Sequence, residues 1–227
     1  MRVAIYYTPP ADHPLTTAVA LWLGRDAFTG RPLPTPPDAT VDVGTITAEP
    51  RRYGFHATMK APFRLPRDRG LAELDRVLAA FCAAIAPVKA MQLKIERLGS
   101  FFALTPASSD GPVAALAASV VKRFEAFRAA PEPEELARRT AAGLNTVQQH
   151  NLQRWGYPYV FDEFRFHMTL TGPIAPVQRD AVLGILRERF GALLADPIEI
   201  DALALFVQAG SRADFLVHAR HPLQGRA

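Results

Sequence analysis

The sequence has little cysteine and no long apolar run. With the single cysteine Cys82 in 227 residues, no internal disulfide and no cysteine cluster for zinc can form. The longest apolar run, Val77 to Ala86, is too short to span a bilayer and predicts a buried helix. The first residues also lack the apolar stretch and cleavage site of a signal peptide. We therefore expect a cytoplasmic protein that does not enter a membrane.

Neither sign of charge is in large excess. Lys and Arg number 26 against 22 Asp and Glu, a net charge of +4, and no block of Lys and Arg stands out. This weak excess is compatible with a small anionic substrate or with nucleic acid, and requires neither. The 49% apolar content is ordinary for a globular protein, and the length allows one large domain or two small lobes with a shared core.

One motif occurs twice. FHATMKAPF (55–63) and FHMTLTGPI (166–174) share Phe, His, Thr and Pro in register. Each string has strand alternation, and each is followed by a predicted helix and then by a pair of predicted strands. The helices are predicted over 71–85 and 177–194, and the strand pairs over 93–98 with 101–105 and 198–208 with 214–219. This repeat predicts two related lobes in a single domain over 1–227, centred on 50–106 and 160–221.

The remaining elements flank this repeat or separate its copies. The pattern predicts a strand over 2–8, a helix over 14–23, and an alanine-rich helix over 113–129. An acidic helix is expected after Pro131, and a further helix from Asn145 to near Gly156. The last two helices have no counterpart in the first half, so we interpret about 131–156 as a helical insertion.

The repeated motif places an imidazole beside a hydroxyl on one strand face. Residues i and i+2 of a strand share a face, so His56 points with Thr58, and His167 points with Thr169 and Thr171. Phe55 and Phe166 then face the core. If the two copies meet across one cleft, they supply what hydrolysis of a phosphodiester needs. One neutral imidazole takes a proton from water, one imidazolium protonates the leaving oxygen, and the hydroxyls bind the non-bridging oxygens.

A metal is not expected in this site. Asp162 and Glu163 precede the second motif, but nothing matches them at the first, so the repeat does not indicate a shared metal site. Lys60 and Arg165 share strand faces with the histidines and are candidates to bind phosphate or, equally, residues of a solvated edge. Tyr53 is a candidate to line the cleft, against the alternative of a core or rim position.

These motifs resemble those of the 2H phosphoesterase superfamily, which carries one His-x-Thr/Ser signature in each of two lobes. The longer strings RRYGFHATMKAPF (51–63) and WGYPYVFDEFRFHMTLTGP (155–173) resemble the branch labelled DUF1045, often described as a putative phosphonate metabolism protein. The resemblance implies a bilobal, LigT-like α+β fold with antiparallel sheets lining a central cleft. It also implies histidines as acid and base, hydroxyls on the phosphate, and no cofactor.

The sequence therefore predicts a metal-independent phosphodiesterase that hydrolyses a small cyclic phosphodiester. The resemblance implies a ribose or nucleoside cyclic phosphate, with an RNA end as a further possible partner, and the residues indicate no obligate protein partner. Two alternatives stay open: a non-catalytic module that binds an RNA end or nucleotide, and an enzyme that joins RNA ends by the reverse reaction.

Overall fold

The computed structural model describes residues 1–38, 40–109, 111–131 and 143–225 of the chain. Its strands are β1 (Arg2–Tyr7), β2 (Ala57–Phe63), β3 (Val88–Met91), β4 (Leu93–Leu98), β5 (Phe101–Pro106), β6 (Met168–Thr169), β7 (Ile198–Ile200), β8 (Ala202–Gln208) and β9 (Leu216–Pro222). Its α-helices are α1 (Pro14–Leu23), α2 (Val43–Ile46), α3 (Ala48–Arg51), α4 (Leu71–Ala84), α5 (Gly111–Arg123), α7 (Thr146–Trp155) and α8 (Arg179–Phe190). The α+β class predicted from the sequence is confirmed.

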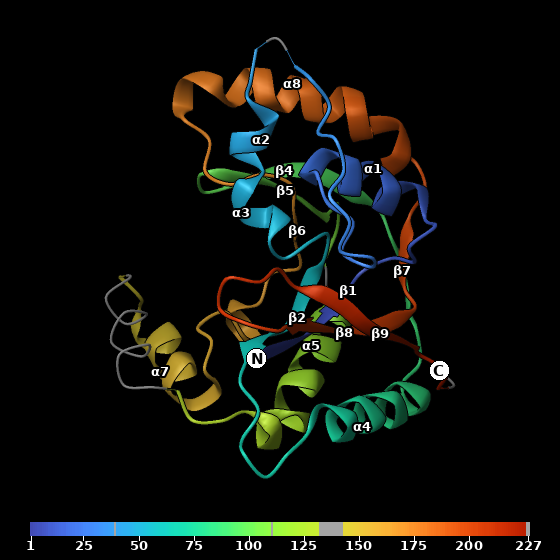
Figure 1. The fold of residues 1–227 in the computed structure, drawn as a ribbon, viewed down its shortest axis with the longest axis vertical. Helices are drawn as coiled ribbons and strands as arrows, with labels where there is room; N and C mark the ends of the chain where they lie inside the picture. The colour runs from blue at the N-terminus through green and yellow to red at the C-terminus, as the bar shows by residue number, and fades with distance from the viewer. Residues whose placement is uncertain (39, 110, 132–142, 226–227) are drawn as a thin grey trace.

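One antiparallel sheet runs through the molecule in the order β4-β5-β6-β2-β1-β8-β9. It has two halves, β4-β5-β6 and β2-β1-β8-β9, which are joined at the single pair Ala57 and Met168. In Figure 1 the first half lies in the upper part of the molecule with α1 and α8, and the second lies in the lower part with α4 and α5. Strands β3 and β7 form a separate antiparallel pair.

The strand pairing corrects the lobe boundaries expected from the sequence. The strands β4 and β5, which follow the first motif, pair with β6 of the second motif. The strands β8 and β9, which follow the second motif, pair with β1 beside β2 of the first. The segments 50–106 and 160–221 are therefore not separate lobes, because each contributes its strand pair to the sheet of the other.

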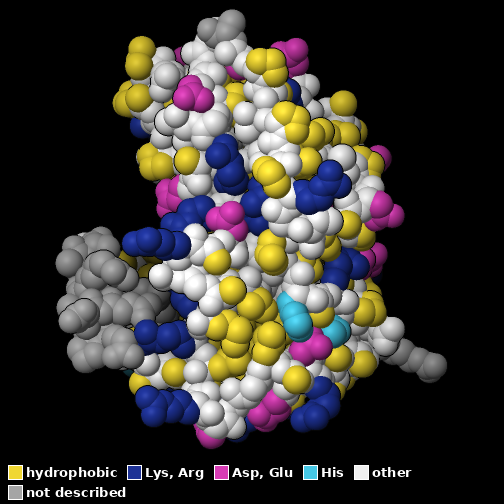
Figure 2. Space-filling model, in the orientation of Figure 1, with side chains coloured by type: hydrophobic (Ala, Val, Ile, Leu, Met, Phe, Trp, Pro, Cys, Tyr) yellow, Lys and Arg dark blue, Asp and Glu magenta, His cyan; other side chains and the backbone are white. Residues whose placement is uncertain are grey.

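Helices pack against one face of the sheet. One apolar cluster runs between this face and the helices in both halves. It includes Val3, Ile5 and Tyr7 of β1 and residues of α1, α4, α5 and α8. The alternate residues Ala4 and Tyr6 belong to a second, smaller cluster on the opposite face of β1. That opposite face carries the candidate site. Figure 2 shows Lys and Arg side chains along the middle of the molecule, between its upper and lower parts.

Two helices, α1 and α7, begin and end where the sequence predicted. The helices predicted over 113–129 and 177–194 are shorter than predicted, and α5 ends at Arg123 and α8 at Phe190. Pro14 begins α1, and Gly24 ends it in the left-handed conformation, with φ 77°. Asn145 caps α7 with a capping box to Gln148, and Gly156 ends it with φ 74°. Of the predicted insertion, the acidic helix after Pro131 falls on 132–142, outside the described residues. Within the described part of the chain, no helix has the length and apolarity to cross a membrane.

Candidate active site

The two His-x-Thr motifs meet at the centre of the sheet. Ala57 of β2 and Met168 of β6 are register partners in an antiparallel pair, and both side chains are buried in the core. Residues one step to either side then project to the opposite face. Antiparallel register places each motif histidine opposite the threonine of the other motif: His56 opposite Thr169, and His167 opposite Thr58. Phe55 and Phe166, at 3% and 2% exposure, lie in the core as predicted.

Each of the two imidazoles has a hydrogen bond of the same kind, from Nδ1 to a backbone carbonyl group. The Nδ1 of His56 lies 2.9 Å from the carbonyl oxygen of Gly54, and the Nδ1 of His167 lies 2.9 Å from that of Arg165. When Nδ1–H donates to such a carbonyl, Nε2 is the nitrogen left to face the cleft. At Gly54 only glycine suits this turn, because φ is 79° and an added Cβ would lie 2.5 Å from Ala27 Cβ.

Two adjoining cavities flank the motifs. The smaller, of about 350 Å³, is bordered by His56, Thr58 and Thr169, and the larger, of about 810 Å³, by Thr58 and His167. Both cavities are also bordered by Ala61, Phe101 and Tyr157. Thr58 thus lies between the two cavities. It borders the smaller one together with His56 and Thr169, and the larger one together with His167.

The hydroxyls of Thr58 and Thr169 are available to a ligand. Both side chains are half-buried, and neither hydroxyl hydrogen-bonds to another part of the chain that the structure describes. Thr171 differs, although it borders the smaller cavity. Its buried Oγ1 accepts a hydrogen bond from Phe102 N at 3.0 Å and donates one to Gly172 O at 2.8 Å. The expectation that Thr171 presents its hydroxyl with Thr169 is wrong, because the strand ends at Thr169.

Lys60 does not lie on the histidine face, which corrects the sequence expectation. Tyr6 pairs with Thr58 but Ile5 pairs with Lys60, so a bulge inserts one extra residue into β2 and breaks the alternation. The Lys60 side chain is buried. Its Nζ lies 2.9 Å from Glu125 Oε2 and donates to Val121 O at 3.2 Å. Lys60 therefore anchors α5 to the sheet and borders neither cavity at the motifs.

Arg165 and Tyr53 do border the cavities. Arg165 is exposed at the larger cavity, beside the histidine that its carbonyl group holds. Tyr53 borders the smaller cavity, where its ring stacks on Phe215 with centroids 5.4 Å apart. Both positions are compatible with contact to a substrate.

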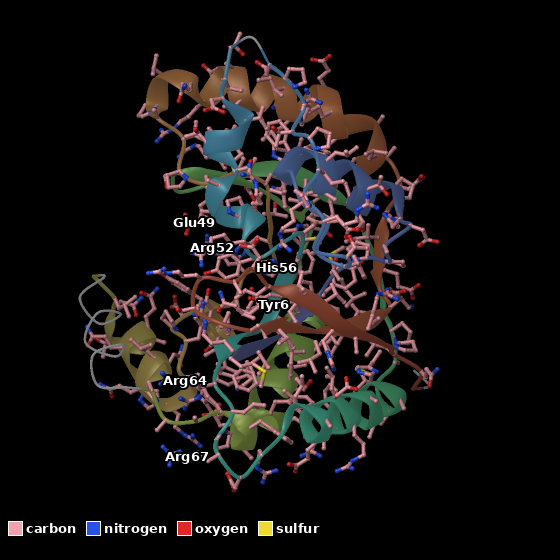
Figure 3. The ribbon with its side chains drawn as sticks, in the orientation of Figure 1. Tyr6, Glu49, Arg52, His56, Arg64 and Arg67 are labelled. Carbon is pink, nitrogen blue, oxygen red and sulfur yellow. The ribbon has the colours of Figure 1, made fainter. Side chains whose placement is uncertain are left out.

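Tyr6, which no sequence pattern indicates as a site residue, stacks on His56. The ring centroids are 3.9 Å apart and the planes meet at 24°. Figure 3 shows the two side chains next to each other in the middle of the molecule, with Glu49 and Arg52 nearby on the upper part. Burial is the main cause that lowers the pKa of His56 to about 4, and the charge of His167 lowers it further, while the Gly54 hydrogen bond opposes the shift. His56 is therefore a neutral imidazole at neutral pH.

Among the described residues, no group of three or more His, Cys, Asp or Glu side chains is placed to hold a metal ion. Of the two carboxylates that precede the second motif, Glu163 borders the larger cavity. Glu163 accepts a hydrogen bond from Gln148 Nε2 at 2.7 Å, and Asp162 is exposed. The polar groups that border the two cavities include imidazoles, hydroxyls, tyrosines, Arg165, Arg2 and Glu49.

Residues 58–216 match the model of a family described as "Protein of unknown function (DUF1045)". The match covers well over half of the chain, and the protein belongs to this family. The family assignment made from the two motif strings is thus confirmed. The matched range includes Thr58, His167 and Thr169, and begins two residues after His56.

Two curated relatives are both named "Ribose 1,5-bisphosphate phosphokinase PhnN". The protein of Janthinobacterium sp. (strain Marseille) is 37% identical over 232 residues, which cover 99% of this chain and 51% of that protein. The protein of Laribacter hongkongensis (strain HLHK9) is 34% identical over 215 residues, which cover 95% of this chain and 50% of that protein. The chain spans about half the length of the curated relatives it matches, so their name describes proteins of about twice this size.

Similar solved structures include TT0787 of Thermus thermophilus and LigT of E. coli complexed with NADP+. The first has a TM-score of 0.49 and 14% identity over all of both chains. The second has a TM-score of 0.43 and 13% identity, covering 98% of this chain and 96% of that one. A third, described as a phosphoesterase, has a TM-score of 0.40 and 12% identity, and covers 98% of each chain. At such values, any assignment of function depends on the site itself.

Proposed function

We propose that this protein is a metal-independent phosphodiesterase that hydrolyses a small cyclic phosphodiester with His56 and His167. The observation that carries the proposal is the pairing of Ala57 with Met168, which sets each motif histidine opposite the threonine of the other motif. One phosphate at this junction has an imidazole and a hydroxyl on each side. That symmetric set suits in-line displacement, in which the attacking and leaving oxygens lie on opposite sides of phosphorus.

In this mechanism His56 is the base and His167 the acid. Because its pKa is about 4, His56 is neutral at neutral pH, and its Nε2 accepts a proton from water. The water oxygen bonds to phosphorus as the bond to the leaving oxygen breaks, and the Nε2–H of His167 protonates that oxygen. The hydroxyls of Thr58 and Thr169 donate hydrogen bonds to the non-bridging oxygens as their charge grows. Proton exchange with solvent then restores both imidazoles.

The substrate we infer is a cyclic phosphate of ribose or of a nucleoside. The relatives are named for a ribose bisphosphate, which favours ribose. The smaller cavity also carries groups that bind sugar hydroxyls, namely the phenols of Tyr53 and Tyr157 with Arg2 and Glu49 at its border. A kinase reaction is less well supported by these residues. The sequence contains no Gly-Lys pair, which the nucleotide-binding P-loop motif requires.

The test is hydrolysis of ribose 1,2-cyclic phosphate and of the four nucleoside 2′,3′-cyclic phosphates in buffer with EDTA. We expect turnover of at least one substrate at a rate that EDTA does not change. Binding of these compounds without turnover would favour a binding module instead. Activity that EDTA abolishes and a divalent metal restores would contradict the mechanism.

A further inference from the structure

The two motif histidines have matched hydrogen bonds but different surroundings. Each Nδ1 lies 2.9 Å from the carbonyl oxygen two residues earlier. His56, however, has an aromatic ring stacked on one face at 3.9 Å. The ring beside His167 is that of Phe101, at 6.0 Å and tilted by 54°, which is a much looser contact.

The difference begins at one strand position. In the half formed by β2-β1-β8-β9, Tyr6 of β1 is the register partner of the motif threonine Thr58. In the half formed by β4-β5-β6, the register partner of Thr169 is Ala103 of β5. The two positions are equivalent in the repeat, since the neighbouring pairs Tyr7 with Ala57 and Leu104 with Met168 also correspond. A tyrosine therefore stands in one half where an alanine stands in the other.

Tyr6 is rigidly placed. Its side chain is 1% exposed, and it packs against Phe206 at 4.9 Å and Phe215 at 6.3 Å between ring centroids. With Tyr6 on one face and the Gly54 carbonyl at Nδ1, the His56 ring can neither tilt nor rotate without losing a contact. The same cover keeps water from that face of the imidazole.

We propose that Tyr6 is a positioning residue that clamps the His56 ring and thereby makes the two motif histidines unequal, with His56 as the base and His167 as the acid. This assignment rests on the proposed function, whereas the clamp itself does not. Burial is the main cause of the low pKa of His56, and Tyr6 covers one face of its ring. The other titratable groups near the His56 ring include Tyr53, 6.1 Å away between centroids, and His167 across the cleft. Arg2, Glu49 and Tyr157 border the same cavity as His56.

The test compares Tyr6→Ala, which copies Ala103, with Tyr6→Phe, which keeps the ring and removes only the hydroxyl. The pKa of His56 is read from the pH dependence of its Hε1 resonance by NMR, assigned by the loss of that signal in His56→Gln. We expect Tyr6→Phe to keep the pKa near 4 and Tyr6→Ala to raise it toward the value of about 6.5 of an exposed histidine. Tyr6→Thr, with a side chain suited to a strand, serves if Tyr6→Ala does not fold.

A folded Tyr6→Ala or Tyr6→Thr variant with an unchanged pKa of His56 would overturn the proposal. An equal rise in Tyr6→Phe would also overturn it, because the hydroxyl and not the stacked ring would then be responsible. The titration needs no substrate, so it separates this inference from the proposed function. A shift of the pKa in a protein that hydrolyses none of the cyclic phosphates would uphold the clamp and reject the enzyme.

Discussion

Ala57 lies opposite Met168, and this pair joins the two halves of the sheet. Because the strands are antiparallel, the motif residues on either side of it meet crosswise, each histidine facing the threonine of the other motif. An arrangement in which each motif formed its own site would leave the histidines apart. The crosswise arrangement instead predicts that neither motif functions alone.

Replacing either histidine is therefore expected to abolish most of the activity. His56→Gln and His167→Gln should each lower kcat by roughly 10²–10⁴-fold, the usual contribution of a general acid or base. The double variant should lose little more than the worse single variant, because both groups act in one proton relay. The measurement is kcat on the cyclic phosphate that the wild type hydrolyses best. Multiplicative losses would indicate independent roles.

The three motif threonines should separate into two kinds. Thr58→Val and Thr169→Val remove a hydroxyl without a partner in the described chain, so each should lower kcat by up to about 10²–10³-fold and leave the melting temperature nearly unchanged. Thr171→Val leaves the buried Phe102 N–H without its acceptor, so it should destabilise the fold by about 1–3 kcal/mol. Thermal unfolding and kcat, measured together, test this division. A stable, inactive Thr171→Val would contradict it.

Lys60 and Arg165 should also behave differently, although both adjoin a motif. Lys60→Met removes the buried partner of Glu125, which keeps its ion pair with Arg128, so a loss of about 1–3 kcal/mol in unfolding free energy is expected with no change in KM. Arg165→Met removes an exposed cation at the larger cavity, so it should raise KM roughly tenfold, equivalent to about 1.4 kcal/mol, at unchanged stability. Urea unfolding and Michaelis kinetics distinguish the two. A raised KM in folded Lys60→Met would contradict its structural role.

The low pKa of His56 should make the fold sensitive to acid. The folded pKa is about 4 and that of an exposed histidine is about 6.5, so between these values the unfolded state binds more protons than the folded state. The free energy of unfolding should therefore fall as the pH is lowered from about 6.5 to 4. Urea unfolding at several pH values measures this slope, and His56→Gln should show less of it. Equal slopes in the two proteins would show that His56 is not the source.

Local patterns predicted most of the residues that line the candidate site. The alternation around Phe55 and Phe166 identified the core face, and the turn residues Asn145 and Gly156 located α7. Predictions failed where pairing between distant strands decides the outcome. The bulge opposite Ile5 places the Lys60 side chain on the core side of the sheet. The strand pair that follows each motif pairs with the strands beside the other motif.

No sequence pattern indicates Tyr6, for a similar reason. It reaches His56 only through the pairing of β1 with β2, and its own strand carries no motif. The repeat alone does not reveal it either, because Ala103 occupies the equivalent position in the other half. A residue that differs between the two halves cannot be found by comparing what the two copies of the motif have in common.

The most direct test of the account is a crystal structure with vanadate, which mimics the pentacoordinate phosphorus of the transition state. We predict one vanadate at the junction of the two cavities, with the Nε2 atoms of His56 and His167 each about 3 Å from oxygens on opposite sides of the metal centre. The hydroxyls of Thr58 and Thr169 should contact its remaining oxygens. A vanadate bound by only one of the two histidines, or bound outside the cleft, would contradict the claim that the two motifs share a single phosphate.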